Sequence, residues 1–290
     1  MLADLKELWR FRELLWAMVE RELRIRYKNS ALGFLWSLLN PLVTVAVMWM
    51  VFTFIMGSNT DNYSAYILAA YLPFLFFNMS LMDSSQSVLV SLQVVKKVYF
   101  PREILPIASV ISNFIHFVLA LGVFFVFLLG VWVMNGFGIS PFTWKLLVLP
   151  LLLVPFLALV MGFSLMLSAL NVFYEDVKYI LSVVLYLLFF VSPVMYFSET
   201  VKASASKFAN GDLIYTVYHL NPISTWITAF RKVLVPEGKI EVIQNGVAVK
   251  VGPDPFNYPM VAVACLTSFG MLVFGYWLFN RMKWRFVERP

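Results

Sequence analysis

The chain is poor in charged residues and cysteine, and it lacks a nucleotide-binding loop. Charged side chains make up 13% of its 290 residues, whereas soluble domains carry roughly 25%, so a soluble fold is excluded. The single cysteine, Cys265, excludes a disulfide framework and a cysteine-based metal cluster. Because no G-x-x-x-x-G-K-[ST] pattern occurs, we expect no nucleotide hydrolysis by this chain. We also expect no catalytic residue, no metal site and no cofactor of its own.

Long apolar runs are what the chain has in abundance. Hydrophobic residues make up 61% of it, and runs of about 18 residues or more, enough for a helix to cross a bilayer, recur along it. They predict an all-α polytopic membrane protein, with one transmembrane domain over residues 1–290 and six spanning helices. Five predicted spans lie within residues 33–196, at 33–56, 63–90, 104–134, 145–170 and 179–196, and the sixth covers residues 259–280. The fifth is expected to end at Ser192-Pro193.

The N-terminal segment 1–28 has a different pattern. Between residues 3 and 27, Leu8, Leu15 and Val19 share one helical face and most charged residues lie opposite. This pattern predicts one amphipathic helix that lies in the plane of the membrane surface. A helix that packs on a soluble partner is the alternative.

Residues 197–258, between the fifth and sixth spans, are too polar to cross the membrane. Asn221-Pro222 predicts the start of a helix that runs to Lys232. Asn245-Gly246, between alternating residues, predicts a β-hairpin over residues 239–251, to which the sequence assigns no task. The sixth span is followed by a basic tail, residues 281–290.

The distribution of Lys and Arg predicts the orientation. Most of these residues lie in segment 1–32, in the loop 91–103 and in the C-terminal tail. Short loops rich in Lys and Arg stay in the cytoplasm, so we expect both termini and the 91–103 loop to be cytoplasmic and residues 197–258 to face outward. The net charge of +6 comes from these span ends and predicts membrane contact, with no nucleic-acid partner.

A basic island separates the second and third predicted spans. Each Lys or Arg would cost about 2.5–3.5 kcal/mol at the centre of a spanning helix, so the island should lie outside the hydrocarbon. Its bulky apolar residues favour a brief helix that docks into a partner's groove, with Pro101 opening the next helix. An ordinary charged loop is the alternative. The candidate docking residues are Lys96, Lys97, Val98, Tyr99, Phe100, Pro101, Arg102 and Glu103.

Two polar residues fall inside predicted spans, and ionisable residues in a membrane are functional candidates. Asp83 lies in the second span and His116 in the third. Asp83 is a candidate site, or else it forms a hydrogen bond to a neighbouring helix. His116 is a candidate proton relay, or else a packing residue. The sequence leaves both pairs of alternatives open.

Cations and aromatic residues supply two further candidate sets. Arg24, Arg26, Tyr27 and Lys28 lie at the predicted membrane surface, where they would bind lipid phosphate or simply anchor the topology. Tyr179, Tyr186 and Phe190 share one face of the fifth span. Such a face would line a tunnel for sugars, because aromatic rings stack on them, or it would face lipid. The candidate tunnel residues are Trp36, Tyr179, Tyr186, Phe189, Phe190 and Tyr196.

Five stretches together resemble one family, the permease subunits of ABC-2 type exporters of polysaccharide and polyol-phosphate polymers such as O-antigen, capsule, teichoic acid and galactan. The loop around Glu175 departs from it, because the family commonly has a basic residue there, and the hairpin is longer than in compact members. The similar stretches are RYKNSALGFLWSLLNPL (26–42), VKKVYFPREILP (95–106), NVFYEDVKYI (171–180), SPVMY (192–196) and LNPISTWITAFR (220–231).

The resemblance implies a homodimer in the bacterial cytoplasmic membrane, with two copies of a separate ATPase subunit that bind ATP and Mg²⁺. It implies that residues 96–103 form the coupling helix seated in the ATPase and that the loop 26–34 meets the headgroup of a lipid-linked polymer. Residues 197–258 would hold re-entrant helices at the outer mouth of the tunnel, where protein or a wet cavity satisfies their backbone.

We therefore expect a permease subunit of an ATP-driven exporter of a lipid-linked polysaccharide or teichoic-acid-type polymer. An ABC-2 type exporter of small molecules or drugs is one alternative. An integral membrane glycosyl or acyl transferase is another, and it would need catalytic acids or a His–acid set at one membrane face. Asp83, Glu175 and Asp176 do not form such a set in the sequence.

Overall fold

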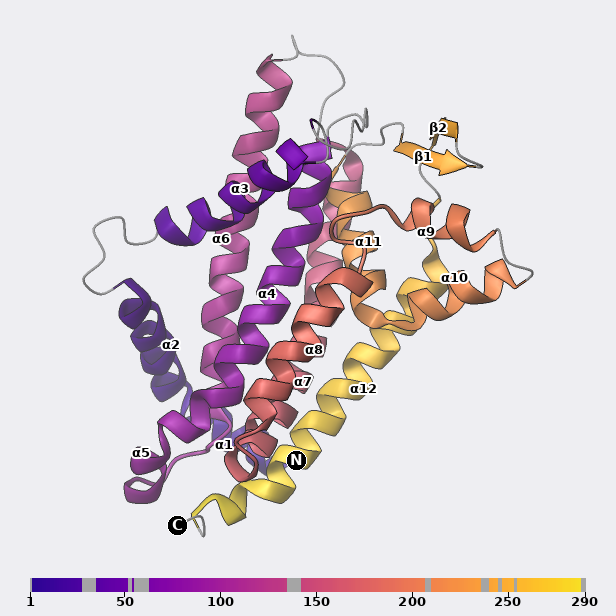
Figure 1. Ribbon diagram of the computed structural model, residues 1–290. Coiled ribbons are helices and arrows are strands. Elements are labelled where there is room, and N and C mark those ends of the chain that lie inside the picture. The colour runs from indigo at the N-terminus through magenta and orange to yellow at the C-terminus, as the bar shows by residue number, and fades with distance from the viewer. Residues whose placement is uncertain are drawn as a thin grey trace.

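The computed structural model describes residues 2–27, 35–51, 54, 63–134, 142–206, 210–235, 240–244, 247–252 and 255–287. These residues form a bundle of helices with one pair of short strands at one end (Figure 1).

Long apolar helices make up the centre of the bundle. Among the described residues, four helices are long and apolar enough to cross a membrane. These helices, α4, α6, α7 and α12, run lengthwise through the bundle in Figure 1. They coincide with the second, third, fourth and sixth predicted spans. Their bounds are α4 Tyr63–Val90, α6 Ile104–Met134, α7 Leu149–Phe173 after the 3-10 turn η2 Trp144–Val148, and α12 Tyr258–Met282 before the 3-10 turn η3 Lys283–Val287.

Two apolar helices are shorter. Helix α3 (Leu35–Met50) has 16 residues and α8 (Val177–Val191) has 15, fewer than the roughly 20 that cross a 30 Å hydrocarbon layer. Helix α3 lies obliquely against α4 (Figure 1), and the rest of the first predicted span, residues 51–56, includes positions outside the described residues. The fifth helix ends at Val191, directly before Ser192-Pro193 as predicted, and does not continue to residue 196. It ends there because Pro193 disfavours a helical conformation at Ser192 and has no N–H to donate.

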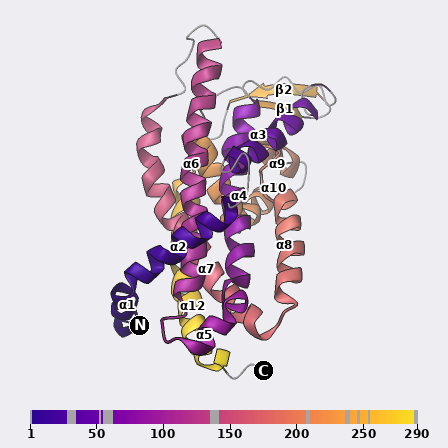
Figure 2. The same ribbon diagram turned by 90° about the vertical axis from the view of Figure 1, so that its left-hand side faces the viewer.

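The N-terminal segment forms two helices in place of the single one predicted. Helix α1 covers Leu2–Arg10, α2 covers Arg12–Tyr27, and Phe11 forms the turn between them. The chain bends at Phe11 because this side chain and Leu8 pack on the apolar cluster at one end of the bundle. Helix α2 then runs obliquely along α6 (Figure 2) with Val19 buried, so part of its apolar face contacts protein.

Both termini and the basic island lie at the same end of the bundle. Figures 1 and 2 show the N- and C-terminal ends beside α5 (Leu92–Lys97), while β1 and β2 lie at the opposite end. This arrangement agrees with the prediction that segment 1–32, loop 91–103 and the tail share one side.

The segment between α8 and α12 covers the opposite end. It contains α9 (Ser198–Ala205), α10 (Gly211–Leu220) and α11 (Pro222–Leu234). Helix α11 begins where predicted, since the Asn221 side chain accepts a hydrogen bond from the Ile223 N–H at 3.1 Å and Pro222 occupies the first turn. Most of its side chains are buried against α4, α7 and α12.

Two strands follow α11 within the predicted hairpin region. Strand β1 (Ile240–Gln244) pairs antiparallel with β2 (Val247–Val251), and Gln244 lies opposite Val247. Asn245 and Gly246 lie outside the described residues.

Helices α7 and α12 approach each other most closely at two glycines. A Cβ atom on Gly275 would collide with the carbonyl oxygen of Gly162, and one on Gly162 would collide with the backbone of Met271. Small residues at such a crossing let the two backbones pack directly on each other, as is common between membrane helices. This contact fixes α12 to α7.

Candidate functional site

The basic island forms α5 followed by a turn, Val98–Glu103, which we call the coupling turn. Helix α6 begins only at Ile104, whose N–H donates to the Pro101 carbonyl oxygen at 3.1 Å. The prediction that Pro101 opens this helix is therefore wrong. Arg102 and Glu103 are held in the turn by contacts with the C-terminal end of α12, which postpones the first helical residue.

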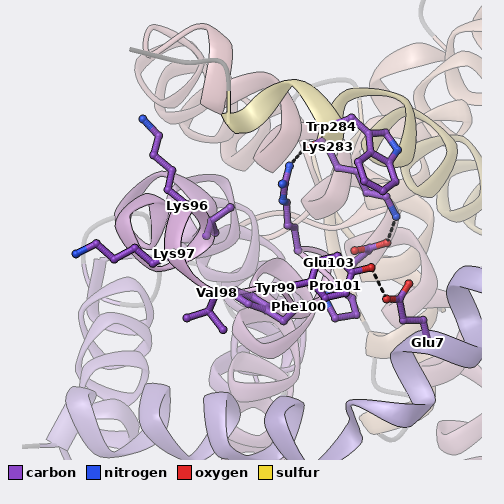
Figure 3. A pocket seen from close by; sticks show the side chains of 12 residues that line it. Glu7, Lys96, Lys97, Val98, Tyr99, Phe100, Pro101, Glu103, Lys283 and Trp284 are labelled. Carbon is purple, nitrogen blue, oxygen red and sulfur yellow. Dashed lines mark hydrogen bonds and ion pairs between the residues drawn. The ribbon is translucent and has the colours of Figure 1, made fainter.

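One half of the island faces outward. The side chains of Lys96 and Lys97 point away from the bundle in Figure 3, and Val98 and Tyr99 are 58% and 74% exposed. The Tyr99 hydroxyl donates to Glu7 of α1 at 2.8 Å, a hydrogen bond that raises the pKa of Tyr99. A pocket of about 250 Å³ lies here, and Glu7, the coupling turn and Trp284 contribute to its lining.

The other half of the island faces inward. Phe100 is 6% exposed and joins an apolar cluster that includes Phe279 and Phe286. Glu103 is 1% exposed, and its Oε1 accepts from Lys283 Nζ at 2.7 Å. The island thus combines an exposed surface, residues 96–99, with a buried base.

Arg102 connects the coupling turn to η3. Its guanidinium donates to the Lys283 carbonyl oxygen and lies 5.9 Å from the centre of the Phe286 ring. Partial burial lowers the pKa of Arg102, which remains a cation at neutral pH because ordinary arginine pKa values exceed 12. The turn is therefore fixed to the C-terminal end of α12 by two cations, Arg102 and Lys283.

The structure brings together Arg26 and Asp83, which the sequence analysis assigned to separate sets. Arg26 Nη2 lies 2.7 Å from Asp83 Oδ2, and Nη1 donates to Asn113 Oδ1 at 2.9 Å. Asn113 Nδ2 in turn donates to Asp83 at 3.0 Å. Sequence reasoning missed Asn113, although it lies three residues before His116 and therefore on the same face of α6. The cluster joins α2 to α4 and α6.

The remaining predicted headgroup residues do not join this cluster. Arg24 pairs with Glu20 on the exposed side of α2 at 2.5 Å. The side chain of Tyr27 and all of Lys28 lie outside the described residues. His116 is half-buried on α6.

The aromatic residues predicted to line a tunnel divide into two groups. Tyr179, Tyr186 and Phe190 are exposed along α8, and the rings of Tyr186 and Phe190 meet edge to face at 5.1 Å. Phe189 packs inward against Phe74 at 5.3 Å, and the Tyr196 hydroxyl donates to the Val191 carbonyl oxygen at 2.6 Å. The side chain of Trp36 lies outside the described residues.

Sequence reasoning also missed Arg231, a buried cation near the end of α11. It is 4% exposed, and its guanidinium donates to the carbonyl oxygens of Pro193 and Tyr196, the latter at 3.2 Å. From α4, the Tyr63 hydroxyl donates to the Met195 carbonyl oxygen at 2.7 Å. The signal that points to it is a cation directly after the largely apolar run Trp226–Phe230, on a helix whose other positions are mostly buried. Two of the motif-like stretches, 192–196 and 220–231, therefore meet through Arg231.

Among the residues that the structure describes, no group of three or more His, Cys, Asp or Glu side chains could hold a metal ion. Two of the paired titratable side chains join separate segments of the bundle. Arg26 joins α2 to α4, and Glu103 joins the coupling turn to η3.

Comparison with known proteins identifies the family. The sequence profile of the ABC-2 type transporters matches residues 13–235. An O-antigen export system permease protein, RfbA, of Klebsiella pneumoniae is 27% identical over 276 residues, which cover 95% of this chain and 94% of that protein. RfbA of Myxococcus xanthus is 30% identical over 233 residues, or 80% of this chain and 84% of that protein. The chain is therefore a multi-pass membrane protein of the ABC-2 type transporter family.

Proposed function

We propose that this chain is the permease subunit of an ATP-driven exporter that moves a lipid-linked polysaccharide across the bacterial cytoplasmic membrane. The observation that carries the proposal is the two-sided basic island. Its outer residues 96–99 offer two cations and two exposed apolar side chains, while its base, Phe100 and Glu103, is buried and fixed to the C-terminal end of α12. A segment that transmits movement from a partner subunit must be exposed, so that the partner can bind it. It must also be rigid, because a flexible segment would bend without moving the helices behind it.

The partner in this proposal is a separate ATPase subunit that binds ATP and Mg²⁺. Membership of the ABC-2 family supports such a partner, and the whole complex would hold two permeases and two ATPases. Both termini and the island would face the cytoplasm, as the positive-inside rule predicts. Six spans would result if α3 and α8, with their flanking residues, cross in the dimer.

The proposed cargo follows from the relatives and from α8. The relatives named above are O-antigen export permeases, and O-antigen is a polysaccharide. Tyr179, Tyr186 and Phe190 expose their rings along one helix. Such a row gives sugar rings successive faces to stack on. Two copies of this face, opposed across a dimer axis, would line a passage for a glycan chain.

The path of the lipid headgroup belongs to the same proposal. The ion pair of Arg24 with Glu20 on α2 is exposed to solvent and therefore weak. Arg24 would exchange this partner for lipid phosphate, which contributes about 1 kcal/mol per basic group near an anionic surface. Arg26 is already paired with Asp83, so its role would be to hold the end of α2 beside α4 and α6.

Co-purification with the ATPase tests the proposal. The variant Val98→Ser/Tyr99→Ala removes the exposed apolar surface and leaves the buried base intact. We expect at least about tenfold weaker binding to the ATPase, since a Tyr anchor at an interface commonly contributes more than 1 kcal/mol.

Tyr174→Ala is the matched control. It removes another exposed tyrosine, which lies in the turn between α7 and α8. We expect wild-type binding and export from this control. Wild-type binding and export in the Val98/Tyr99 variant, or a wild-type permease that binds no nucleotide-hydrolysing subunit, would contradict the assignment.

A further inference from the structure

We propose that the buried Glu103–Lys283 ion pair couples the coupling turn mechanically to α12. Movement of the turn would then reach the outer end of the protein through α12 as well as through α4 and α6, to which the turn is joined in the chain. This inference rests on the proposed function, because it assumes that an ATPase moves the coupling turn. It assigns positioning roles to Glu103, Lys283 and Arg231.

The path begins with three contacts between the coupling turn and η3. Glu103 and Lys283 form an ion pair at 2.7 Å, with both side chains buried. Arg102 adds its hydrogen bond to the Lys283 carbonyl oxygen. Phe100 and Phe286 belong to the same apolar cluster. The turn and the end of α12 are therefore held together by charge, hydrogen bond and packing at once, although 180 residues separate Glu103 from Lys283.

The stability of the fold does not by itself explain why a buried ion pair stands at this position. Within the described residues, the second carboxylate oxygen of Glu103, Oε2, is buried without a hydrogen-bond partner. Desolvation of both charges offsets most of the attraction in such a pair, so a well-packed apolar pair would stabilise the protein as well or better. What the pair supplies is a fixed orientation of the turn relative to α12.

Helix α12 transmits this orientation because it packs tightly along its length. The backbones of α7 and α12 touch at Gly162 and Gly275, which leaves no compressible side chains between them. Close-packed interiors shift as units, so α12 moves together with α7. At its other half, Ser268 of α12 accepts a hydrogen bond from Trp226 Nε1 of α11 at 3.2 Å.

The path ends at the outer end of α8. Helix α11 carries Arg231, which donates to the carbonyl oxygens of Pro193 and Tyr196 in the turn after α8. That turn follows the helix whose exposed aromatic face we assign to the sugar passage. A displacement of η3 thus reaches the turn after α8 through α12, through the contact of α12 with α11, and through Arg231. Figure 1 shows that α12 runs from the end with the termini to the end where α11 lies.

The test uses the permease in complex with its ATPase, in lipid vesicles, and measures polymer export per ATP hydrolysed. The variants are Glu103→Gln/Lys283→Met, which removes both charges without leaving one buried alone, and the exchange Glu103→Lys/Lys283→Glu. We expect the neutral variant to bind the ATPase and hydrolyse ATP normally but to export about tenfold less polymer per ATP, a typical coupling between distant sites. The exchange should restore at least half of the wild-type ratio.

Arg21→Met/Glu22→Gln is the control, because it neutralises an exposed ion pair on α2; we expect the wild-type ratio. A wild-type ratio in the neutral variant overturns the inference, and so does failure of both the neutral and the exchanged forms to insert, which would show that the pair serves folding. Loss of ATPase binding in the neutral variant assigns the pair to docking and likewise overturns it. The proposed function fails separately, if the wild-type chain binds no ATPase.

Discussion

At the scale of single residues, buried and half-buried cations in this protein hold helices together. Arg26 joins α2 to Asp83 and Asn113, Lys283 holds Glu103, and Arg231 holds the turn after α8. Each of them reaches its partners with directional hydrogen bonds, which fix a geometry that apolar contacts alone leave adjustable. The sequence analysis assigned Arg26 to lipid, and this assignment stays a prediction.

The Arg26 cluster predicts a measurable loss of stability. Asp83→Asn keeps the size of the side chain but removes its charge, so Arg26 and Asn113 lose a charged acceptor. We expect the free energy of unfolding to fall by about 1–3 kcal/mol, the cost of losing a hydrogen bond to a charged group. Thermal unfolding in detergent measures it. Glu20→Gln, which breaks the exposed Arg24–Glu20 pair, should change stability by less than about 0.5 kcal/mol; equal losses in both variants would contradict the prediction.

Arg231 predicts a larger effect at the outer end. Arg231→Met removes the donors to Pro193 and Tyr196 and leaves their carbonyl oxygens without this partner. We expect a loss of about 2–4 kcal/mol in unfolding free energy, from two or more charged hydrogen bonds. Faster proteolysis within residues 192–197 should accompany it, because the turn loses its anchor. Arg231→Lys should recover part of the loss, and an unchanged cleavage rate in Arg231→Met would refute the anchoring role.

At the scale of elements, the crossing of α7 and α12 brings two helix backbones into direct contact. It depends on glycines at both positions, Gly162 and Gly275, because neither leaves room for a methyl group. This crossing fixes the position of α12 relative to α7, and it therefore also fixes the elements that contact α12. Both η3, which holds the coupling turn, and α11, through Trp226 and Ser268, are attached in this way.

Gly275→Ala tests the crossing. The added methyl group would force α12 away from the Gly162 carbonyl oxygen, and we expect a loss of about 1–3 kcal/mol, the usual effect of overpacking. Gly270→Ala is the matched control on the same helix, since a Cβ atom there meets no atom within 4 Å. The control should be neutral or more stable by up to about 1 kcal/mol, because alanine favours helix over glycine. The same unfolding midpoint for both variants would show that the crossing is looser than described.

At the scale of the whole molecule, the two ends of the bundle differ in what they present. One end carries the termini and the basic island, and the other carries α9, α10 and the paired strands (Figure 2). This polarity suits a protein that receives work at one membrane face and releases its cargo at the other.

Labelling of introduced cysteines tests the orientation. In a Cys265→Ala background, Lys97→Cys lies at the end with the termini and Gly252→Cys lies at the other end, after β2. With a membrane-impermeant maleimide, we expect Gly252→Cys to react in intact cells and Lys97→Cys to react only after the cytoplasmic membrane is opened. The reverse pattern would invert the proposed topology.

Much of the fold could be predicted from the sequence, because a spanning helix is encoded locally. The bounds predicted for α4 and α6 match the structure, since each is one apolar run with polar residues at both ends. The end of α8 before Ser192-Pro193 was also predicted, because proline is a local signal. The bend at Phe11 was not predicted, because it results from tertiary packing, which a continuous amphipathic pattern does not reveal.

The candidate site was predictable only in part. The position of the island between two spans is visible in the sequence, but which of its residues face outward is not. Glu103 finds Lys283 only through the folded chain, since helical periodicity reports neighbours three or four residues away. For the same reason Asp83 and Arg26 looked unrelated. Arg231 was overlooked although the helix that carries it was predicted, because its partners Pro193 and Tyr196 lie far from it in the sequence.

The division of the basic island into exposed residues 96–99 and a buried base bears on how such exporters diversify. A change at the four outer positions alters what a foreign ATPase meets and leaves the interior undisturbed. Hybrids between permeases and motors of different organisms should therefore be obtainable by exchanging this short surface. Related exporters would then change their ATPase partner during evolution while the membrane-spanning part of the permease stays the same.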